Sequence, residues 1–382
     1  MDIREVARRS GVSVATVSRA LNNRPDVSHS TRERIVAIAA ELGYRPNHQA
    51  RALVRRRSDL VGLIWDTGYL GTRGRHPFLQ DLLVGLKMAF ADTGRHLLLL
   101  STPESEVDAY ARIARQNNLE GVILMGIDEG HPSISALLES EIPCVAIDLP
   151  LHGNRASYVT SDNRAGAAAA VQHLYSLGHR RIATICGPLD LMPGAERLAG
   201  YRYQTARLDL PYREEYVTHG DFFLASGQAC MRQLLALAQP PTAVFAAGDE
   251  MAIGALDVLA DAGIAVPGQL SVVGYDDVEA AALVRPALTT VAQDSRQLAA
   301  AAARLLADIL DDGRDPTPSR RGSSQRTAAD ERSRPTPQPL GDGAAGPDRP
   351  ITQRDDSRTA VPAPQLVANR LVIRSSTGPA PA

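Results

Sequence analysis

Apolar residues near the start of the chain recur at helical spacing, and a glycine separates two such groups. The residues of the two apolar faces are Ile3, Val6 and Ala7, followed by Val17 and Leu21. Between them, the turn Ser10-Gly11-Val12 contains a glycine that can adopt a positive φ, and Ser13 can cap the next helix. The pattern predicts two short helices joined by a tight turn, which is the arrangement of a helix-turn-helix.

A third amphipathic helix is predicted from residue 31 to residue 42. Its apolar face carries Ile35, Ile38, Ala39 and Leu42. Ser30 and Glu33 have the spacing of a capping box, and Gly43 is placed to end the helix. We therefore expect residues 1–46 to form a small three-helix head with its own core.

From Asp59 onward, short apolar runs alternate with stretches of helical periodicity. The apolar runs are LVGLIW, HLLLLS, GVILMGI and PCVAID, and then YVTSD, RIATICG, TAVFAAGD and QLSVVGYDD. The helical stretches span residues 78–93, 107–116, 134–140, 165–177, 195–207 and 251–262. This alternation predicts an α/β body of two doubly wound, parallel-sheet lobes, the second starting at YVTSD. Ligands of such folds bind beyond the carboxyl ends of the strands, here in the cleft between the lobes.

The composition changes after a helix predicted from Asp294 to Asp312. Residues 313–364 are rich in Pro, Arg, Asp, Ser, Gly and Thr and lack apolar periodicity, which predicts a disordered insertion. A tolerated surface loop explains it most simply, although its mixed charge leaves a binding partner open. The pattern of a strand resumes in LVANRLVIRSSTGP, which we expect to return to the second lobe. No leucine heptad follows Leu371, which favours a dimer over a tetramer.

Charge is distributed unevenly along the chain. Residues 1–57 contain 12 arginines and five acidic residues, a formal charge of +7, whereas the whole chain carries −2 and the remainder therefore −9. Arginine contacts with phosphates release counterions, so a basic head on an acidic body is typical of a DNA-binding module on a regulatory domain. A helical hairpin in an ordinary core is the alternative, which the arginine content disfavours.

The second predicted helix leaves four residues on its outer side. They are Val14, Ala15, Thr16 and Arg19. In helix-turn-helix proteins the start of this helix meets base edges in the major groove. The methyl groups of Val14 and Ala15 suit thymine methyls, and Arg19 can form a bidentate contact with guanine.

Four motifs of the first sixty residues resemble the lactose/galactose repressor family of bacterial transcription regulators. They are VSVATVSRALN, VSHSTRERI, AELGYRPN and the short segment that ends at Arg51-Ala52-Leu53. The resemblance implies a head joined by a hinge helix, residues 47–54, to a periplasmic-binding-protein-like body. It also places Asn47, Ala50 and Leu53 at the minor groove, where Leu53 would wedge between base steps. A linker leucine packed on the body is the alternative for Leu53.

Acidic residues gather at the ends of the predicted strands. They are Asp148, Asp162, Asp249, Asp276 and Asp277. Carboxylates accept hydrogen bonds from ligand hydroxyls, and an arginine can anchor a ring oxygen or a carboxylate, so this chemistry suits a sugar. The family resemblance implies an effector site made of Asp162, Arg197, Phe222, Asp276 and Gln293, with the Phe222 ring placed to stack on a sugar face.

Two positions in this region qualify the prediction of a sugar site. The family usually carries Asn where this chain has Gly248, and the loss of that amide argues against a simple sugar. Asp249 follows at the start of a predicted helix, where a helix cap is at least as good an interpretation as a ligand contact.

Enzyme signatures are missing from the sequence. The glycines after the first strand, Gly68, Gly71 and Gly74, do not form GxGxxG, and no GxxxxGK[ST] or GxSxG motif occurs. We expect no catalytic residue, no cofactor and no metal, and we expect the adjacent Asp276 and Asp277 to point apart. An α/β enzyme that processes a small molecule and carries an incidental helical head is the alternative.

Cysteine usage and hydropathy indicate the compartment. Cys144, Cys186 and Cys230 lie in or beside apolar runs without metal-ligand spacing, which predicts buried, reduced thiols. No signal peptide precedes the first helix, and no apolar run reaches the ~20 residues of a membrane span. We therefore expect a cytoplasmic protein, rather than a secreted sugar-binding protein with the same bilobal architecture.

Together these patterns predict one domain organisation. The parts are a head at 1–46, a hinge helix and linker at 47–58, a bilobal effector-binding and dimerisation domain at 59–312 with 365–376, and an insertion at 313–364. We expect a homodimeric repressor that binds a palindromic operator in double-stranded DNA and responds to a carbohydrate-like effector. Inducer and corepressor remain open, and an architectural or activating role is the alternative within this class.

Overall fold

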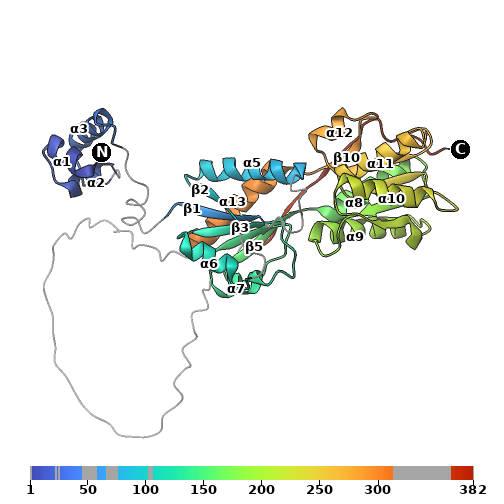
Figure 1. Ribbon diagram of the computed structural model, residues 1–382, viewed down its shortest axis with the longest axis horizontal. Helices are drawn as coiled ribbons and strands as arrows, with labels where there is room; N and C mark the ends of the chain where they lie inside the picture. Colours follow the sequence, from blue (N-terminus) through green and yellow to red (C-terminus); the bar gives the residue numbers. More distant parts are fainter. Residues whose placement is uncertain are drawn as a thin grey trace, which may run out of the picture.

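The computed structural model describes residues 2–21, 24, 26–44, 58–65, 76–101, 106–312 and 363–381. Figure 1 shows a helical head and two α/β lobes. The helices of the head are α1 (Ile3–Ser10), α2 (Val14–Leu21) and α3 (His29–Glu41). The predicted hinge helix and nearly all of the predicted insertion lie outside the described residues.

The head is held by a small apolar core and by local caps. Val6 and Val17 are fully buried in one cluster with Ile35 of α3. The predicted turn is confirmed, because Gly11 has a φ of 67° and the Ser13 hydroxyl accepts a hydrogen bond from the Thr16 amide at 3.1 Å.

The predicted cap of the third helix is wrong. The helix begins two residues earlier than expected, so Ser30 already lies inside it. Ser28 has the extended backbone of an N-cap, and its hydroxyl accepts from the Thr31 amide at 3.4 Å.

The first lobe is built on a parallel six-stranded sheet in the order β11-β5-β4-β3-β1-β2. Its strands are β1 (Leu60–Trp65), β2 (His96–Leu100), β3 (Gly121–Met125), β4 (Cys144–Ile147), β5 (Ala156–Ser161) and β11 (Gln365–Val367). Its helices are α5 (Pro77–Asp92), α6 (Ala109–Gln116), α7 (Ser133–Glu139) and α13 (Ser295–Asp312). The pair α5 and α13 covers one face and the pair α6 and α7 the other (Figure 1), so the central strands are apolar throughout.

The second lobe has a six-stranded sheet in the order β12-β10-β9-β8-β6-β7, parallel except for β12. Its strands are β6 (Ile182–Cys186), β7 (Val217–His219), β8 (Ala243–Ala246), β9 (Ser271–Asp276), β10 (Thr289–Ala292) and β12 (Arg370–Val372). Its helices are α8 (Asn163–Ser176), α9 (Met192–Arg207), the 3-10 helix η2 (Glu214–Tyr216), α10 (Leu224–Leu235), α11 (Asp249–Asp261) and α12 (Glu279–Leu283). Helix α8 packs on α9, and α10 packs on α11.

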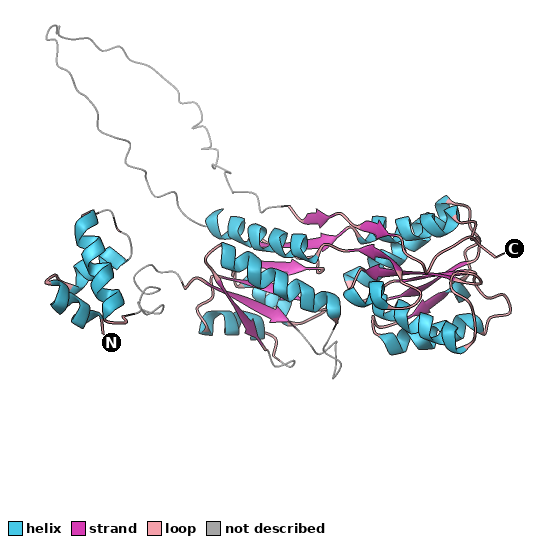
Figure 2. Ribbon diagram, turned by 90° about the horizontal axis from the view of Figure 1, so that it is seen from above, coloured by secondary structure: helices cyan, strands magenta, loops and turns pink. Residues whose placement is uncertain are grey.

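The chain passes between the lobes at points that the sequence pattern did not predict. The YVTSD run forms β5 and pairs with β4, so it completes the first sheet rather than opening the second. The C-terminal segment, residues 363–381, serves both lobes, since β11 lies beside β5 and β12 beside β10 (Figure 2). The expected return to the second lobe alone is therefore wrong. Strands β7 and β10 and helix α10 were also missed.

The three cysteines are free and buried, as predicted. Burial raises the pKa of the Cys144 thiol to about 12 and that of Cys186 to about 11. Within the described ranges, no helix combines the length and the hydropathy that crossing a lipid bilayer requires.

Candidate functional site

The start of α2 presents small apolar side chains and an arginine to solvent. Val14 is 41% exposed, and Ala15 and Arg19 are exposed as well. Thr16 is only partly exposed, and its hydroxyl lies 2.9 Å from the Ser13 hydroxyl. Three of the four predicted base readers therefore face outward, while Thr16 is also engaged in the cap.

Arg19 is held by a weak surface contact. Its Nη1 lies 3.6 Å from Asp26 Oδ2, and both side chains are more than half exposed. Exposed ion pairs contribute about 0–1 kcal/mol, so the guanidinium can leave Asp26 for a base edge or a phosphate at little cost. The predicted minor-groove residues Asn47, Ala50 and Leu53 lie outside the described residues.

A pocket opens between the two lobes at the carboxyl ends of their strands, and we call it the cleft pocket. Its volume is about 710 Å³, part of which is open to solvent. The lining residues are His76, Phe78, Leu79, Leu82, Met125, Gly126, Ile127, Ile147, Asp148, Leu191, Pro193, Arg197, Phe222, Phe223 and Asp276. Mainly apolar walls with a few convergent polar groups are typical of small-molecule sites.

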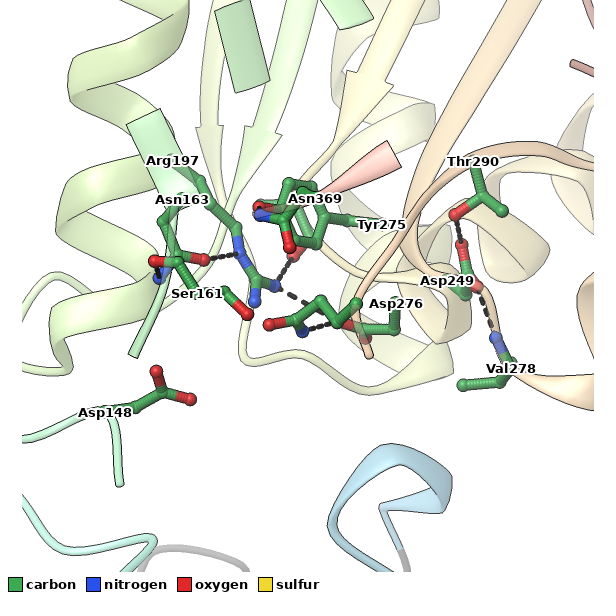
Figure 3. Close-up of polar contacts among 12 residues, drawn as sticks. Asp148, Ser161, Asn163, Arg197, Asp249, Tyr275, Asp276, Val278, Thr290 and Asn369 are labelled. Carbon is green, nitrogen blue, oxygen red and sulfur yellow. Dashed lines mark hydrogen bonds and ion pairs between the residues drawn. The ribbon is translucent and has the colours of Figure 1, made fainter. Parts of the chain in front are cut away.

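Arg197 is the organising side chain of the cleft pocket (Figure 3). Near the start of α9, it is only 3% exposed. Its Nε donates to Asn163 Oδ1 at 2.8 Å, and its Nη1 donates to the Ala247 carbonyl at 2.7 Å and to Asp276 Oδ1 at 3.4 Å. The guanidinium also lies 3.8 Å from the centroid of the Tyr275 ring. These contacts hold a buried cation in one orientation.

Asp276 supplies the balancing charge at the end of β9. Its side chain is 2% exposed, and Gln293 Nε2 donates to its Oδ1 at 2.7 Å. The residue has a φ of 114°, an unfavourable conformation for a non-glycine residue that is typical of functional sites. Gln293 is not part of the pocket lining but positions Asp276, and its Oε1 is buried without a partner among the described residues.

Asp148 reaches the cleft pocket from the first lobe, opposite the Arg197 group (Figure 3). Thr160 Oγ1 donates to its carboxylate at 2.6 Å. Burial raises the pKa of Asp148, and the Thr160 hydrogen bond and the charge of Arg197 only partly oppose that shift. Asp148 was predicted as a strand-end carboxylate but was not among the predicted effector ligands.

Two of the strand-end aspartates do structural work. Asp162 accepts a hydrogen bond from the Ala165 amide at 3.0 Å, which caps α8, and it does not belong to the pocket lining. Asp277 points away from Asp276, as expected, and its Oδ1 lies 2.6 Å from Arg374 Nη2. Asp162 remains a predicted effector ligand, but in this conformation its side chain serves the helix.

Asp249 is buried and has a structural role, because its side chain neither caps a helix nor lines the pocket. Its carboxylate accepts from the Val278 amide at 2.9 Å and from the Thr290 hydroxyl at 2.6 Å (Figure 3). It therefore ties the start of α11 to β10 and to the loop after β9. Burial and the nearby Asp276 carboxylate raise its pKa well above the ordinary value.

The Phe222 ring lies in a space that two glycines leave open. A Cβ on Gly187 would overlap the ring, and one on Gly248 would lie 3.3 Å from its Cδ1. Phe222 has a φ of 68°, and its ring centroid is 5.6 Å from the Arg197 guanidinium. The absence of a side chain at Gly248 thus makes room for an aromatic wall.

Three residues that touch this network were missed in the sequence. Asn163 and Tyr275 hold Arg197, and His76 lines the pocket from the first lobe. For His76 a signal was present, because a polar residue precedes Pro77 at the start of a helix that follows a buried strand. Across the described residues, no cluster of three or more His, Cys, Asp or Glu side chains could hold a metal ion.

Two family models match the chain. Residues 2–47 match the model described as bacterial regulatory proteins, lacI family, and residues 171–327 match a periplasmic binding protein-like domain. The HTH-type transcriptional regulator CelR of Thermobifida fusca is 38% identical over 308 residues, which are 80% of this chain and 90% of that protein. The ribose operon repressor of Escherichia coli (strain K12) is 32% identical over 299 residues, 78% of this chain and 89% of that protein.

Solved structures share the whole architecture. A complex of the transcriptional regulator CelR with cellobiose is 31% identical, covers 98% of this chain and 99% of its own, and superposes with a TM-score of 0.66. The Lac repressor dimer bound to operator and the anti-inducer ONPF is 25% identical, covers 99% of both chains and gives a TM-score of 0.75.

Proposed function

The chain belongs to the lacI family of bacterial regulatory proteins, and on this premise we propose that it is a homodimeric repressor controlled by a carbohydrate-like ligand. The relatives that match over most of their length are transcriptional regulators, which gives the DNA-binding head its role. In this proposal Val14, Ala15 and Arg19 read bases in the major groove, assisted by Thr16. Residues 47–58 connect the head to the body as a hinge.

One observation carries the proposal of a ligand site. A buried Arg197–Asp276 pair, with both side chains at most 4% exposed, faces a pocket between two lobes. A buried ion pair is a poor way to gain stability, so its retention at the carboxyl ends of parallel strands favours a binding role.

The groups around the pocket suit an uncharged polyhydroxyl ligand. The hydrogen bonds of Arg197 within the described chain use Nε and Nη1, which leaves Nη2 to donate to a ligand oxygen. Asp276 balances the charge of Arg197, and Phe222 and Ile147 offer apolar surface to the CH face of a sugar ring. The relative solved with cellobiose supports this class of ligand.

Binding would act on DNA through closure of the lobes. Arg197 and Asp276 belong to the second lobe and Asp148 to the first, so a ligand that touches both sides binds the closed form better. A ligand shifts an equilibrium only by its difference in affinity for the two states. The same residues can serve an inducer, which weakens DNA binding, or a corepressor, which strengthens it. A DNA-binding assay with and without the ligand distinguishes the two.

The test begins with selection of bound sequences from randomised duplex DNA, with and without ligands. The panel contains cellobiose, ribose, glucose, glucuronate and nucleosides. A palindromic consensus whose recovery changes with one compound supports the proposal. Ligand-induced thermal stabilisation is then measured for wild type, for Arg197→Ala, and for Arg180→Ala, an exposed arginine that is not a pocket residue. An unchanged ligand response in Arg197→Ala contradicts the assignment of the site.

A further inference from the structure

His76 lines the cleft pocket from the first lobe, whereas Arg197 belongs to the second. It is the N-cap residue of α5, but its side chain forms no capping hydrogen bond. The residue is 7% exposed and lines the pocket. Its ring is therefore buried at the cleft without serving the helix that it precedes.

Both ring nitrogens of His76 lack a hydrogen-bond partner among the described residues. A buried polar atom left unpaired is destabilising, and most such atoms in proteins are paired. Two unpaired nitrogens on one side chain that faces a pocket indicate groups reserved for a ligand.

Two aromatic rings of the second lobe make edge-to-face contacts with the His76 ring. The centroids of the Phe222 and Phe223 rings lie 6.4 and 6.0 Å from that of His76, with interplanar angles of 79° and 77°. These edge-to-face contacts join the first turn of α5 to the loop before α10 across the cleft. The contacts of His76 thus depend on the separation of the lobes, and its ring also faces the ligand pocket.

The surroundings of His76 favour the neutral form of the imidazole. Burial lowers the pKa of His76, and the positive end of the α5 dipole also disfavours a cation there. The charged groups that face the ring from the second lobe are Asp276 and Arg197, whose effects on this pKa oppose each other. A neutral imidazole offers one donor and one acceptor.

We propose that His76 is a specificity-determining residue, which binds hydroxyl groups of the ligand and selects uncharged polyhydroxyl compounds over anions. A hydroxyl can donate to one imidazole nitrogen or accept from the other, whereas a carboxylate or phosphate dianion only accepts and leaves the acceptor nitrogen unpaired. Because the contact comes from the first lobe, it also couples binding at Arg197 to closure. This inference rests on the proposed function of the cleft pocket.

Two variants separate the roles of the ring. His76→Phe keeps an aromatic ring against Phe222 and Phe223 but has no nitrogen. His76→Asn keeps a donor and an acceptor but loses the ring. His152→Phe is the matched control, because His152 is exposed and lies outside the pocket lining.

Binding is measured by calorimetry with two matched pairs of probes, cellobiose with cellobionate and glucose with glucuronate. We expect wild type to prefer the neutral member, His76→Phe to bind it about tenfold more weakly, and His76→Asn to retain part of the affinity. Affinity for the neutral probe should stay constant as the pH falls through the ordinary histidine range and should decrease only at lower pH, where His76, whose pKa is lowered by burial, becomes protonated. Wild-type affinity for neutral probes in His76→Phe, or a preference for the anionic probes, overturns the proposal.

A titration of the ligand-free protein tests the inference without any ligand. The imidazole signal missing from the spectrum of His76→Phe identifies His76, and its pKa is followed by NMR. A pKa below the ordinary histidine range supports the proposal, and one at or above that range overturns it. If no probe binds wild type, the proposed carbohydrate site fails, and this titration still decides whether His76 is the neutral group that the inference requires.

Discussion

Removal of Arg197 should destabilise the protein far more than an average substitution. Arg197→Ala leaves the Asp276 carboxylate buried, with only the Gln293 bond, and it frees the Asn163 and Ala247 oxygens that Arg197 now pairs. Breaking a buried ion pair by removing one partner costs about 3–5 kcal/mol. This is a large part of the roughly 5–15 kcal/mol by which proteins are stable.

The partner substitution should cost less. Asp276→Asn keeps an oxygen that can accept from Arg197, whose bonds to Asn163 and Ala247 remain. We expect a loss of about 1–3 kcal/mol, that of a charge-assisted hydrogen bond. In the double variant no uncompensated carboxylate is buried, so its loss should be smaller than the sum of the two single losses by about 0.5–3 kcal/mol.

Urea unfolding at pH 7 gives the free energy of unfolding of the three variants and of wild type. The values can be compared if the slope of this free energy against urea concentration is the same in all four proteins. Arg180→Ala serves as the control for an exposed arginine and should stay within about 0.5 kcal/mol of wild type. Single losses that add without any coupling would refute the view that Arg197 and Asp276 form one buried electrostatic unit.

Three further predictions concern separate parts of the chain. Arg19→Ala should weaken binding to the selected operator by about 1–3 kcal/mol and relax one base position per half-site; equal losses on all sequences in fluorescence anisotropy would make Arg19 a phosphate contact. Gly187→Ala should destabilise the protein by about 1–3 kcal/mol, because the added methyl group overlaps the Phe222 ring. A melting temperature and a ligand affinity equal to those of wild type would contradict this position of the ring. Asp249 has a folded-state pKa above its unfolded value, so its burial favours the protonated form and its contribution to stability falls as pH rises from about 4 through the raised pKa; Asp249→Asn should remove this pH dependence in denaturation measured at several pH values, and an identical pH profile would count against it.

Local patterns predicted the head well because its determinants are local. The apolar spacing, Gly11 and Ser13 act within a few residues of each other, and the structure confirms them. The one error in the head, Ser30 in place of Ser28, arises because residues 28–31 include three side chains with a hydroxyl group that can cap a helix.

Strand partners depend on contacts distant in sequence, and there the prediction failed. Nothing within YVTSD distinguishes the edge of one sheet from that of the other, because both offer a parallel, buried neighbour. The same holds for β11 and β12, which follow each other in the chain yet lie in different sheets.

The predicted site came from the family resemblance and from the position of acidic residues at strand ends, and not from geometry. Arg197, Phe222 and Asp276 meet in the cleft pocket, and Gln293 supports Asp276 from behind. Asp162 shows the limit of this reasoning, since a strand-end carboxylate can cap the next helix instead. His76 escaped notice because its one sequence signal, a polar residue before Pro77 at a helix start, is common to many helices. Its burial without a partner among the described residues is visible only in the structure.

The C-terminal segment has a consequence for how the chain folds as it is synthesised. This segment supplies one edge strand to each sheet: β11 next to β5 in the first, and β12 next to β10 in the second. On the ribosome, both sheets must therefore wait with an open edge while residues 313–362 are made, which takes about 3–10 s at typical elongation rates. Open edges are sites of wrong pairing between chains. Both lobes should therefore become resistant to aggregation at the same moment, when the last strands arrive.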